Sequence, residues 1–150
     1  MRQLKFHEQK LLKKVDFLTW KKEDNPRETQ VMRKYHIQNR QDYVLYNRLC
    51  GSVKKVAHRI ALLPKEDKFR HKASQQLLDK LEAMGIIQVK KSLAQCDQLT
   101  VSSFCRRRLP VIMVRYQMAQ NVKDAVKLVE QGHVRVGPQK ITDPAFMVTK

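Results

Sequence analysis

Apolar residues recur every three or four positions along much of the chain, and this spacing is typical of amphipathic helices. The first twenty residues follow it, with leucines and a valine on one side and lysines around the rest. Two interpretations are open for this helix. Either it packs on the domain with a solvated outer face, or it is a basic arm that binds RNA or a partner protein. Asp24, Asn25 and Pro26 end the pattern.

Two longer helices are predicted in the middle of the chain. The first begins at Asp42 and stops before Pro64, and the second covers about residues 67–84. Gly85 suits the left-handed position that follows a helix. The short link between the two helices predicts a helical hairpin. Residues 86–99 lose the helical period, so we expect a connector there with a short extended piece.

The last fifty residues indicate shorter elements. Thr100 or Ser102 is suited to cap a short helix that runs through Arg108. Pro110 has no backbone N–H to donate, so it fits the first position of the next helix, which extends to about Met118.

A further helix and a β-hairpin complete this region. Asn121 suits the N-cap of the helix, and Gly132 suits its end. Residues 133–136 alternate between polar and apolar, the Gly-Pro pair at 137–138 predicts a turn, and residues 146–148 predict the returning strand.

The predicted elements amount to a mostly helical α+β fold in two parts. We expect a basic N-terminal arm and a helical hairpin region over residues 1–99. Residues 100–150 are expected to form a domain of helices with a small β-hairpin sheet.

The charge of the chain indicates an anionic partner. Thirty-one Lys and Arg residues against fourteen Asp and Glu give a formal net charge of +17, which repels itself in the folded state unless it is neutralised. Nucleic acid is the first candidate. A membrane surface is a weaker one, because no apolar run approaches the roughly 18 to 20 residues of a spanning helix. The N-terminus does not have the pattern of a secretory signal, so an intracellular protein is expected.

The densest cluster of cations is the triplet Arg106, Arg107 and Arg108, which directly precedes an apolar stretch that contains Arg115. On a helical wheel Arg108 and Arg115 fall within about twenty degrees of each other, while Leu109 and other apolar residues up to Tyr116 face elsewhere. We therefore expect an apolar platform that presents guanidinium groups to RNA phosphates, although a merely solvated charged face is the alternative. The candidate RNA-binding residues outside this stretch are Lys123, Lys127, His133, Arg135 and Lys140.

No pattern of residues indicates catalysis. Cys50, Cys96 and Cys105 are odd in number and widely spaced, so we expect reduced thiols rather than a disulfide framework or a metal knuckle. The histidines are scattered, and no phosphate-binding loop, nucleophile elbow or dinucleotide fingerprint occurs. We expect no enzymatic activity, no cofactor, no metal and no small-molecule substrate.

Three short motifs in the last fifty residues carry a family resemblance. They are the Arg-Arg-Leu triplet at 107–109, the helix start A-x-N-V-x-x-A at 119–125 and the sequence H-V-R-V at 133–136. Together they resemble the alpha-L RNA-binding motif, also called the S4 domain after a small-subunit ribosomal protein. Upstream, LLDKLEAMGII at 77–87 is similar to the eukaryotic lineage of that family.

Other segments are similar to a nucleolar branch of this lineage, the proteins of the U3 small nucleolar ribonucleoprotein. The segments are HEQKLLKKVDFLTW at 7–20, QVMRKYHIQNR at 30–40 and CRRRLPVIM at 105–113. The resemblance spans nearly the whole chain. Members of the branch have a further tail, whereas this sequence stops at Lys150, so functions that depend on the tail are not assigned to these residues.

The resemblance implies a non-enzymatic RNA-binding subunit of the small-subunit processome in the nucleolus of the nucleus. Such a subunit binds U3 small nucleolar RNA and assists its pairing with precursor ribosomal RNA before early small-subunit rRNA processing. A large acidic scaffold protein of the same particle is implied as a partner. The main alternative is a structural small-subunit ribosomal protein of the S4 family. An RNA-modifying enzyme is a weaker alternative, because the chain leaves no room for a catalytic domain.

Overall fold

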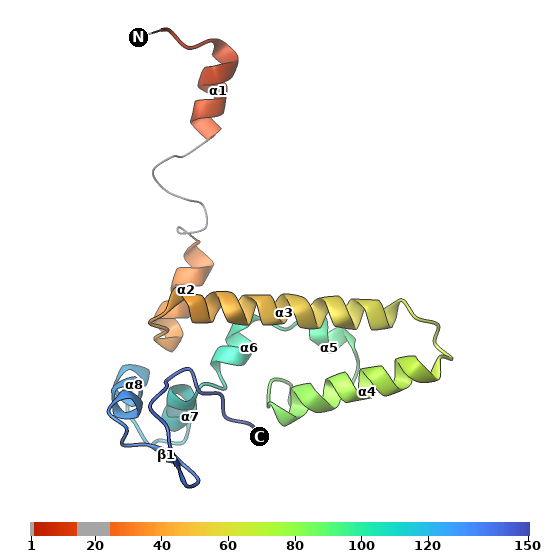
Figure 1. Cartoon of the computed structure of the whole chain (residues 1–150), viewed down its shortest axis with the longest axis vertical. Coiled ribbons are helices and arrows are strands. Elements are labelled where there is room, and N and C mark those ends of the chain that lie inside the picture. The colour runs from red at the N-terminus through yellow and green to blue at the C-terminus, as the bar shows by residue number, and fades with distance from the viewer. Residues whose placement is uncertain (1, 15–24) are drawn as a thin grey trace.

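The computed structural model describes residues 2–14 and 25–150, and within them it confirms the mostly helical α+β class (Figure 1). The elements are α1 (Phe6–Lys14), α2 (Pro26–Tyr35), α3 (Arg40–Ala61), α4 (Lys68–Ala83), α5 (Ala94–Asp97), α6 (Val101–Cys105), α7 (Leu109–Arg115), α8 (Val122–Glu130), β1 (Arg135–Val136) and β2 (Gln139–Lys140). The second half of the predicted first helix, from residue 15 onward, and the predicted break at Asp24 lie outside the described residues.

Helix α1 extends away from the other elements (Figure 1) and has no buried residue. Its apolar side chains are solvent-exposed, Phe6 to 80% and Leu11 to 60%. The described part of this helix therefore buries no side chain against the domain, and the basic arm that binds RNA or a partner protein stays a prediction.

Helix α2 begins where the sequence pattern indicated only a break. The side chain of Asn25 accepts a hydrogen bond from the backbone N–H of Arg27 at 3.2 Å, and Pro26 occupies the first turn. These are N-terminal signals of a helix. The helix ends at Tyr35, and the backbone of the following His36 is left-handed with φ 48°. The chain then turns into α3, which starts two residues before the predicted Asp42.

Helices α3 and α4 form the predicted hairpin and lie side by side (Figure 1). Asp67 caps α4 by accepting the N–H of Phe69 at 2.8 Å, and Gly85 has the expected left-handed conformation, with φ +67°. A core between these helices and the following connector consists of Ala57, Leu81, Ile87, Cys96 and Leu99. The expected extended piece in the connector is wrong, because α5 forms there instead and buries Cys96.

Helix α6 joins the C-terminal region to α3. Its side chains Val101, Phe104 and Cys105 are buried in one cluster with residues of α2 and α3. The rings of Tyr46 and Phe104 stack with centroids 6.2 Å apart. The helix ends at Cys105, three residues earlier than predicted. Since α6 packs in the same core as α2 and α3, this core does not separate residues 1–99 from residues 100–150. The expected domain boundary at residues 99 and 100 stays a prediction.

Helices α7 and α8 pack against each other and against the hairpin. Their shared core is Leu109, Met113, Ala125, Val129 and Ile141. Pro110 is the second residue of α7 rather than the first, and the helix ends at Arg115 instead of near Met118. The helix is shorter because Gln117 adopts a left-handed conformation, with φ 60°.

The hairpin returns earlier than predicted. Strand β1 pairs with β2, with Arg135 opposite Lys140 and Val136 opposite Gln139. The Gly-Pro turn at 137–138 leaves a two-residue loop, so the residues directly after it complete the hairpin. Residues 146–148 are not the partner of β1.

Residues 146–148 pair instead with residues 107–109. The N–H of Leu109 donates to the carbonyl of Phe146 at 2.9 Å, and the N–H of Val148 donates to the carbonyl of Arg107 at 2.9 Å. Arg108 and Met147 form the antiparallel bridge between the two segments. The arginine triplet therefore lies partly in a small extended pairing, between α6 and α7.

Candidate nucleic-acid interface

The three consecutive arginines have three different environments. Arg106 directly follows α6 and has an exposed side chain. Arg107 is half-buried, and Arg108 is only 2% exposed. The triplet is therefore not one cationic face.

Arg107 holds the C-terminal segment in place. Its Nε and Nη2 donate to the carbonyl of Val148 at 2.9 and 2.6 Å, and Nη2 also donates to the carbonyl of Thr149 at 2.8 Å. The guanidinium lies directly over Gly85, where a Cβ atom would come within 2.7 Å of its Cζ. Carbonyl oxygens carry no net charge, so the positive charge of Arg107 is not neutralised by these bonds.

Arg108 is a structural residue. Its Nη1 lies 3.1 Å from Oδ2 of Asp42 on α3, and the two side chains are 3% and 21% exposed. Its backbone is extended, with φ −64° and ψ 140°, so it precedes α7 and does not follow the helical wheel. The predicted ridge of Arg108 and Arg115 is therefore wrong, because Arg108 is buried against Asp42 and not exposed to a ligand.

Arg106, Arg107 and Arg115 converge on one pocket of about 370 Å³. The other lining residues are Gly85, Ile87, Gln88, Ser103, Tyr116 and Lys150. No acidic residue is among them. Within the described ranges, neither Arg106 nor Arg115 forms an ion pair with a carboxylate. The pocket is therefore a concentrated site of positive charge.

Tyr116 and Lys150 belong to this pocket but were not predicted as site residues. Tyr116 was expected in the apolar stripe of α7, yet it is 71% exposed. The helix ends at Arg115, directly before Tyr116, and the backbone of Gln117 is left-handed, so the Tyr116 ring does not follow the core-facing stripe. Lys150 lies 3.4 Å from Glu82, and its backbone N–H donates to the carbonyl of Ala83. Lys150 is 35 residues from Arg115 in the sequence and at least 43 from Arg106 and Arg107, so no local motif could have indicated it.

The other predicted cations lie outside this pocket, on α8 and the hairpin. Lys123 and Lys127 are exposed and four positions apart on α8, which places them on one side of the helix. His133, Arg135 and Lys140 are also exposed. None of these five residues forms an ion pair within the part of the chain that the structure describes.

Two of these cations face each other across the hairpin. Arg135 is directly opposite Lys140 in the register of β1 and β2, and like charges in that position are destabilising. The aliphatic end of Lys140 lies over Gly132, where a Cβ atom would collide with its Cε. An anion bound at this end of the domain would relieve the repulsion between the two side chains.

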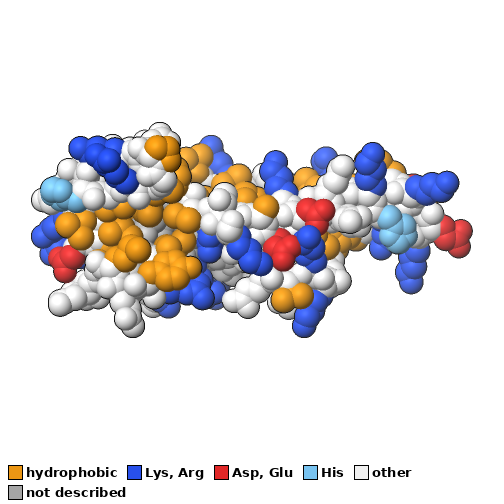
Figure 2. Space-filling view, turned by 90° about the horizontal axis from the view of Figure 1, so that it is seen from below, with side chains coloured by type: hydrophobic (Ala, Val, Ile, Leu, Met, Phe, Trp, Pro, Cys, Tyr) orange, Lys and Arg blue, Asp and Glu red, His pale blue; other side chains and the backbone are white. Residues whose placement is uncertain are grey.

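The face seen from below in Figure 1 carries more basic than acidic side chains. Figure 2 shows Lys and Arg side chains spread over this face with far fewer acidic ones, and hydrophobic side chains gathered at the end that holds α7, α8 and the hairpin. Such an excess of positive charge attracts polyphosphate chains.

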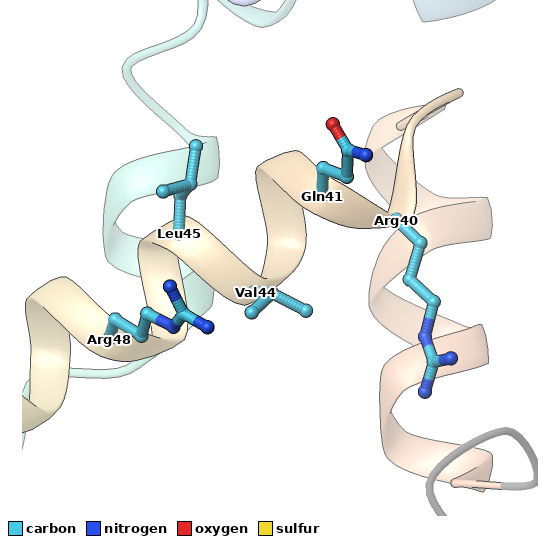
Figure 3. Close-up of a pocket in the computed structure, with 5 residues that line it drawn as sticks. All are labelled: Arg40, Gln41, Val44, Leu45 and Arg48. Atoms are coloured by element: carbon cyan, nitrogen blue, oxygen red, sulfur yellow. The ribbon is translucent and has the colours of Figure 1, made fainter.

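A second surface on α3 combines apolar and basic side chains. Figure 3 shows a pocket of about 450 Å³, which is lined by Arg40, Gln41, Val44, Leu45 and Arg48. Arg40 extends along α2, where its Nε lies 2.7 Å from Oε1 of Glu28.

The apolar stripe of this surface continues along α3. Leu45 is 54% exposed, Leu49 is 46% exposed and Val56 is 45% exposed. Exposed cations run beside the stripe at Arg48, Lys55 and Arg59. This face of α3, which we call the α3 stripe, was not predicted, because helical periodicity does not distinguish a covered apolar side from an open one.

Three further features bear on other kinds of site: the buried cysteine thiols, the length and polarity of the helices, and the grouping of possible metal ligands. Burial raises the pKa of Cys50 and Cys96, and it raises the pKa of Cys105 to about 11, so these thiols are protonated at neutral pH. In residues 2–14 and 25–150 no helix is long and apolar enough to cross a bilayer. In the same ranges no three His, Cys, Asp or Glu side chains gather as metal ligands.

Comparison with protein families divides the chain into two matching regions. The family described as "Ribosomal protein S4/S9 N-terminal domain" matches residues 3–106, and the family described as "S4 domain" matches residues 107–150. The second match contains the pocket cations Arg107 and Arg115 and all the predicted cations of α8 and the hairpin.

Individual relatives are similar over the full length of the chain. The U3 small nucleolar ribonucleoprotein protein IMP3 of Saccharomyces cerevisiae is 58% identical over 151 residues, covering 100% of this chain and 82% of the relative. The human protein of the same name is 54% identical with the same coverage. The small ribosomal subunit protein uS4 of Hyperthermus butylicus is 28% identical over 131 residues, covering 87% of this chain and 73% of the relative.

Proposed function

The chain belongs to the IMP3 family of U3 small nucleolar ribonucleoprotein proteins, and from this membership we propose that it is an RNA-binding subunit of that particle in the nucleolus. We propose further that it assists the pairing of U3 RNA with precursor ribosomal RNA in early small-subunit rRNA processing. The observation that carries the proposal is the pocket on which Arg106, Arg107 and Arg115 converge, with no acidic residue among its described lining residues.

The exposed cations supply a physical mechanism for pairing two RNAs. Two strands repel each other through their phosphates, and a cationic surface lowers this barrier because it releases condensed counterions when it binds the backbone. The formal net charge of +17 and the exposed cations of the pocket, α8 and the hairpin support this role. No covalent chemistry is needed, so the proposed subunit is non-enzymatic.

An annealing assay tests the pairing role. The 5′ region of U3 RNA and a complementary precursor rRNA fragment are labelled with a donor and an acceptor dye, and the pairing rate is measured with and without the full chain. We expect the protein to accelerate pairing, and the acceleration to fall as salt rises. An unchanged rate at low salt, with both RNAs bound, contradicts the pairing role.

Cell fractionation separates the proposal from a structural ribosomal role. A subunit of the U3 particle sediments with nucleolar precursors and is absent from mature cytoplasmic subunits. A permanent ribosomal protein of the S4 family sediments with the mature small subunit, and that result overturns the proposal.

We also propose that a large acidic scaffold protein of the same particle binds the α3 stripe. The exposed leucines at 45 and 49 offer an apolar contact, and the row of Arg48, Lys55 and Arg59 complements an acidic partner. An amphipathic helix with an acidic edge fits both features.

Charge placed in the apolar stripe tests this contact. The double change Leu45→Glu and Leu49→Glu is compared with Leu62→Glu, which alters a 72% exposed leucine at the end of α3. We expect the double variant to lose the acidic scaffold, identified by mass spectrometry in particles isolated through the tagged chain, and to keep its RNA affinity. Full retention of the scaffold contradicts the assignment of this surface.

A further inference from the structure

We infer that the pocket lined by Arg106, Arg115 and Tyr116 receives a single unpaired RNA nucleotide turned out of its strand. In this arrangement the base stacks on the Tyr116 ring and its phosphates contact the two arginines. The inference rests on the proposed RNA-binding function and specifies which form of RNA this pocket recognises.

The shape of the pocket fits a small ligand rather than a rigid duplex. Its volume of about 370 Å³ is near the lower end of the roughly 300–1,000 Å³ range of small-molecule sites. The walls come from the connector after α4, from α6 and the arginines that follow it, from the end of α7 and from Lys150. A base that remains inside a helix does not enter such a hollow, whereas an unstacked base does.

The chemistry of the walls is divided between charge and an aromatic face. Arg106 and Arg115 have planar guanidinium groups that bind phosphate oxygens in pairs. Tyr116 is 71% exposed in the same lining, so its ring is open to a ligand. Phosphate binding alone requires no aromatic residue, but stacking on aromatic side chains is how proteins bind unpaired bases.

The backbone holds Tyr116 at this position. Its N–H donates to the carbonyl of Ile112 at 2.9 Å, and the left-handed Gln117 turns the chain away directly after it. In the same lining, Arg107 is held by its hydrogen bonds to the carbonyls of Val148 and Thr149 and adds a positive charge. The pocket is therefore largely preformed, which reduces the entropy lost on binding.

Binding measurements with the full chain test the inference. The probes are a twelve-nucleotide single-stranded RNA, a blunt RNA duplex of the same length and a free nucleoside monophosphate. Tyr116→Ala and Tyr116→Phe are compared with the wild-type chain. The matched control is Met118→Ala, which truncates a 70% exposed side chain outside the pocket.

We expect Tyr116→Ala to weaken single-strand binding by about 5- to 150-fold, the usual effect of losing one stacked base. Tyr116→Phe and Met118→Ala should stay within about twofold of wild type, and duplex binding should be unchanged in all variants. Equal single-strand affinity for the alanine and phenylalanine variants overturns the inference.

The remaining outcomes separate this inference from the proposed function. A wild-type chain that binds neither RNA probe contradicts the RNA-binding role itself. A third outcome is that the wild-type chain binds the free monophosphate tightly and that Tyr116→Ala abolishes this binding without changing the affinity for the single strand. This outcome overturns the RNA assignment and identifies a mononucleotide site instead.

Discussion

Arg108 and Asp42 form an ion pair 3.1 Å long between residues 66 positions apart in the sequence, and the arginine is almost completely buried. The pair links the start of α7 to the first turn of α3. It therefore ties the S4 region to the N-terminal helical region, while the side chain of the neighbouring Arg106 is exposed.

Breaking this ion pair should destabilise the protein strongly. Asp42→Asn leaves the buried guanidinium without its carboxylate, and removing one partner of a buried pair typically costs about 3–5 kcal/mol of unfolding free energy. Arg108→Met removes the other partner. The loss of unfolding free energy in the double variant should be smaller than the sum of the two single losses by about 1–3 kcal/mol. Urea unfolding of all four proteins measures the coupling, and additive losses show that the pair is not coupled.

Two glycines should respond to alanine in opposite directions. Gly85 has φ +67° and lies under Arg107, so Gly85→Ala adds backbone strain of roughly 1–2 kcal/mol and displaces the guanidinium. Gly51 lies inside α3 with nothing within 4 Å of the added Cβ. Gly51→Ala should therefore stabilise the protein by about 0.5–1 kcal/mol. Thermal unfolding compares them, and equal shifts of Tm contradict this account.

Much of the backbone was predictable from local signals. Helices α3, α4 and α8 follow their apolar periodicity, and Asp67 and Gly85 mark the two ends of α4 as expected. Signals of this kind act within a few residues, so one sequence is enough to find them.

The fate of the individual arginines was not predictable in this way. Arg108 is buried because of a carboxylate on a distant helix, and Arg107 is held by carbonyls of the C-terminal segment. Tyr116 leaves the core-facing stripe because of the left-handed residue after it. Each of these environments depends on tertiary contacts that helical periodicity does not contain.

The stability of the protein should fall in alkaline solution. Burial raises the pKa of Cys105 from 9.0 to about 11, so between these values the unfolded chain loses the thiol proton while the folded chain retains it. The contribution of the Cys105 thiol to the unfolding free energy is fully present below about pH 9. Above that pH it declines by about 1.4 kcal/mol per pH unit until the folded thiol also ionises.

Comparison with Cys105→Ala isolates this effect from other groups that titrate at high pH. The unfolding free energy of both proteins is measured by urea titration between pH 8 and pH 11. We expect the unfolding free energy of the wild-type protein to fall more steeply with pH than that of the variant. The difference in slope should correspond to about one proton per molecule. Parallel curves show that the thiol ionises equally in the folded and unfolded chains.

The salt dependence of RNA affinity tests the central claim most directly, that the exposed cations of the pocket bind RNA phosphates. Binding to about six phosphates predicts a slope of log affinity against log salt of roughly −4 to −5 for the wild-type chain. The double change Arg106→Gln and Arg115→Gln is compared with Lys68→Gln and Lys72→Gln, which removes the same charge from the exposed side of α4. We predict that the pocket variant flattens the slope by about 1.5 and the α4 variant leaves it unchanged. Identical slopes for the wild-type chain and the pocket variant would contradict the account.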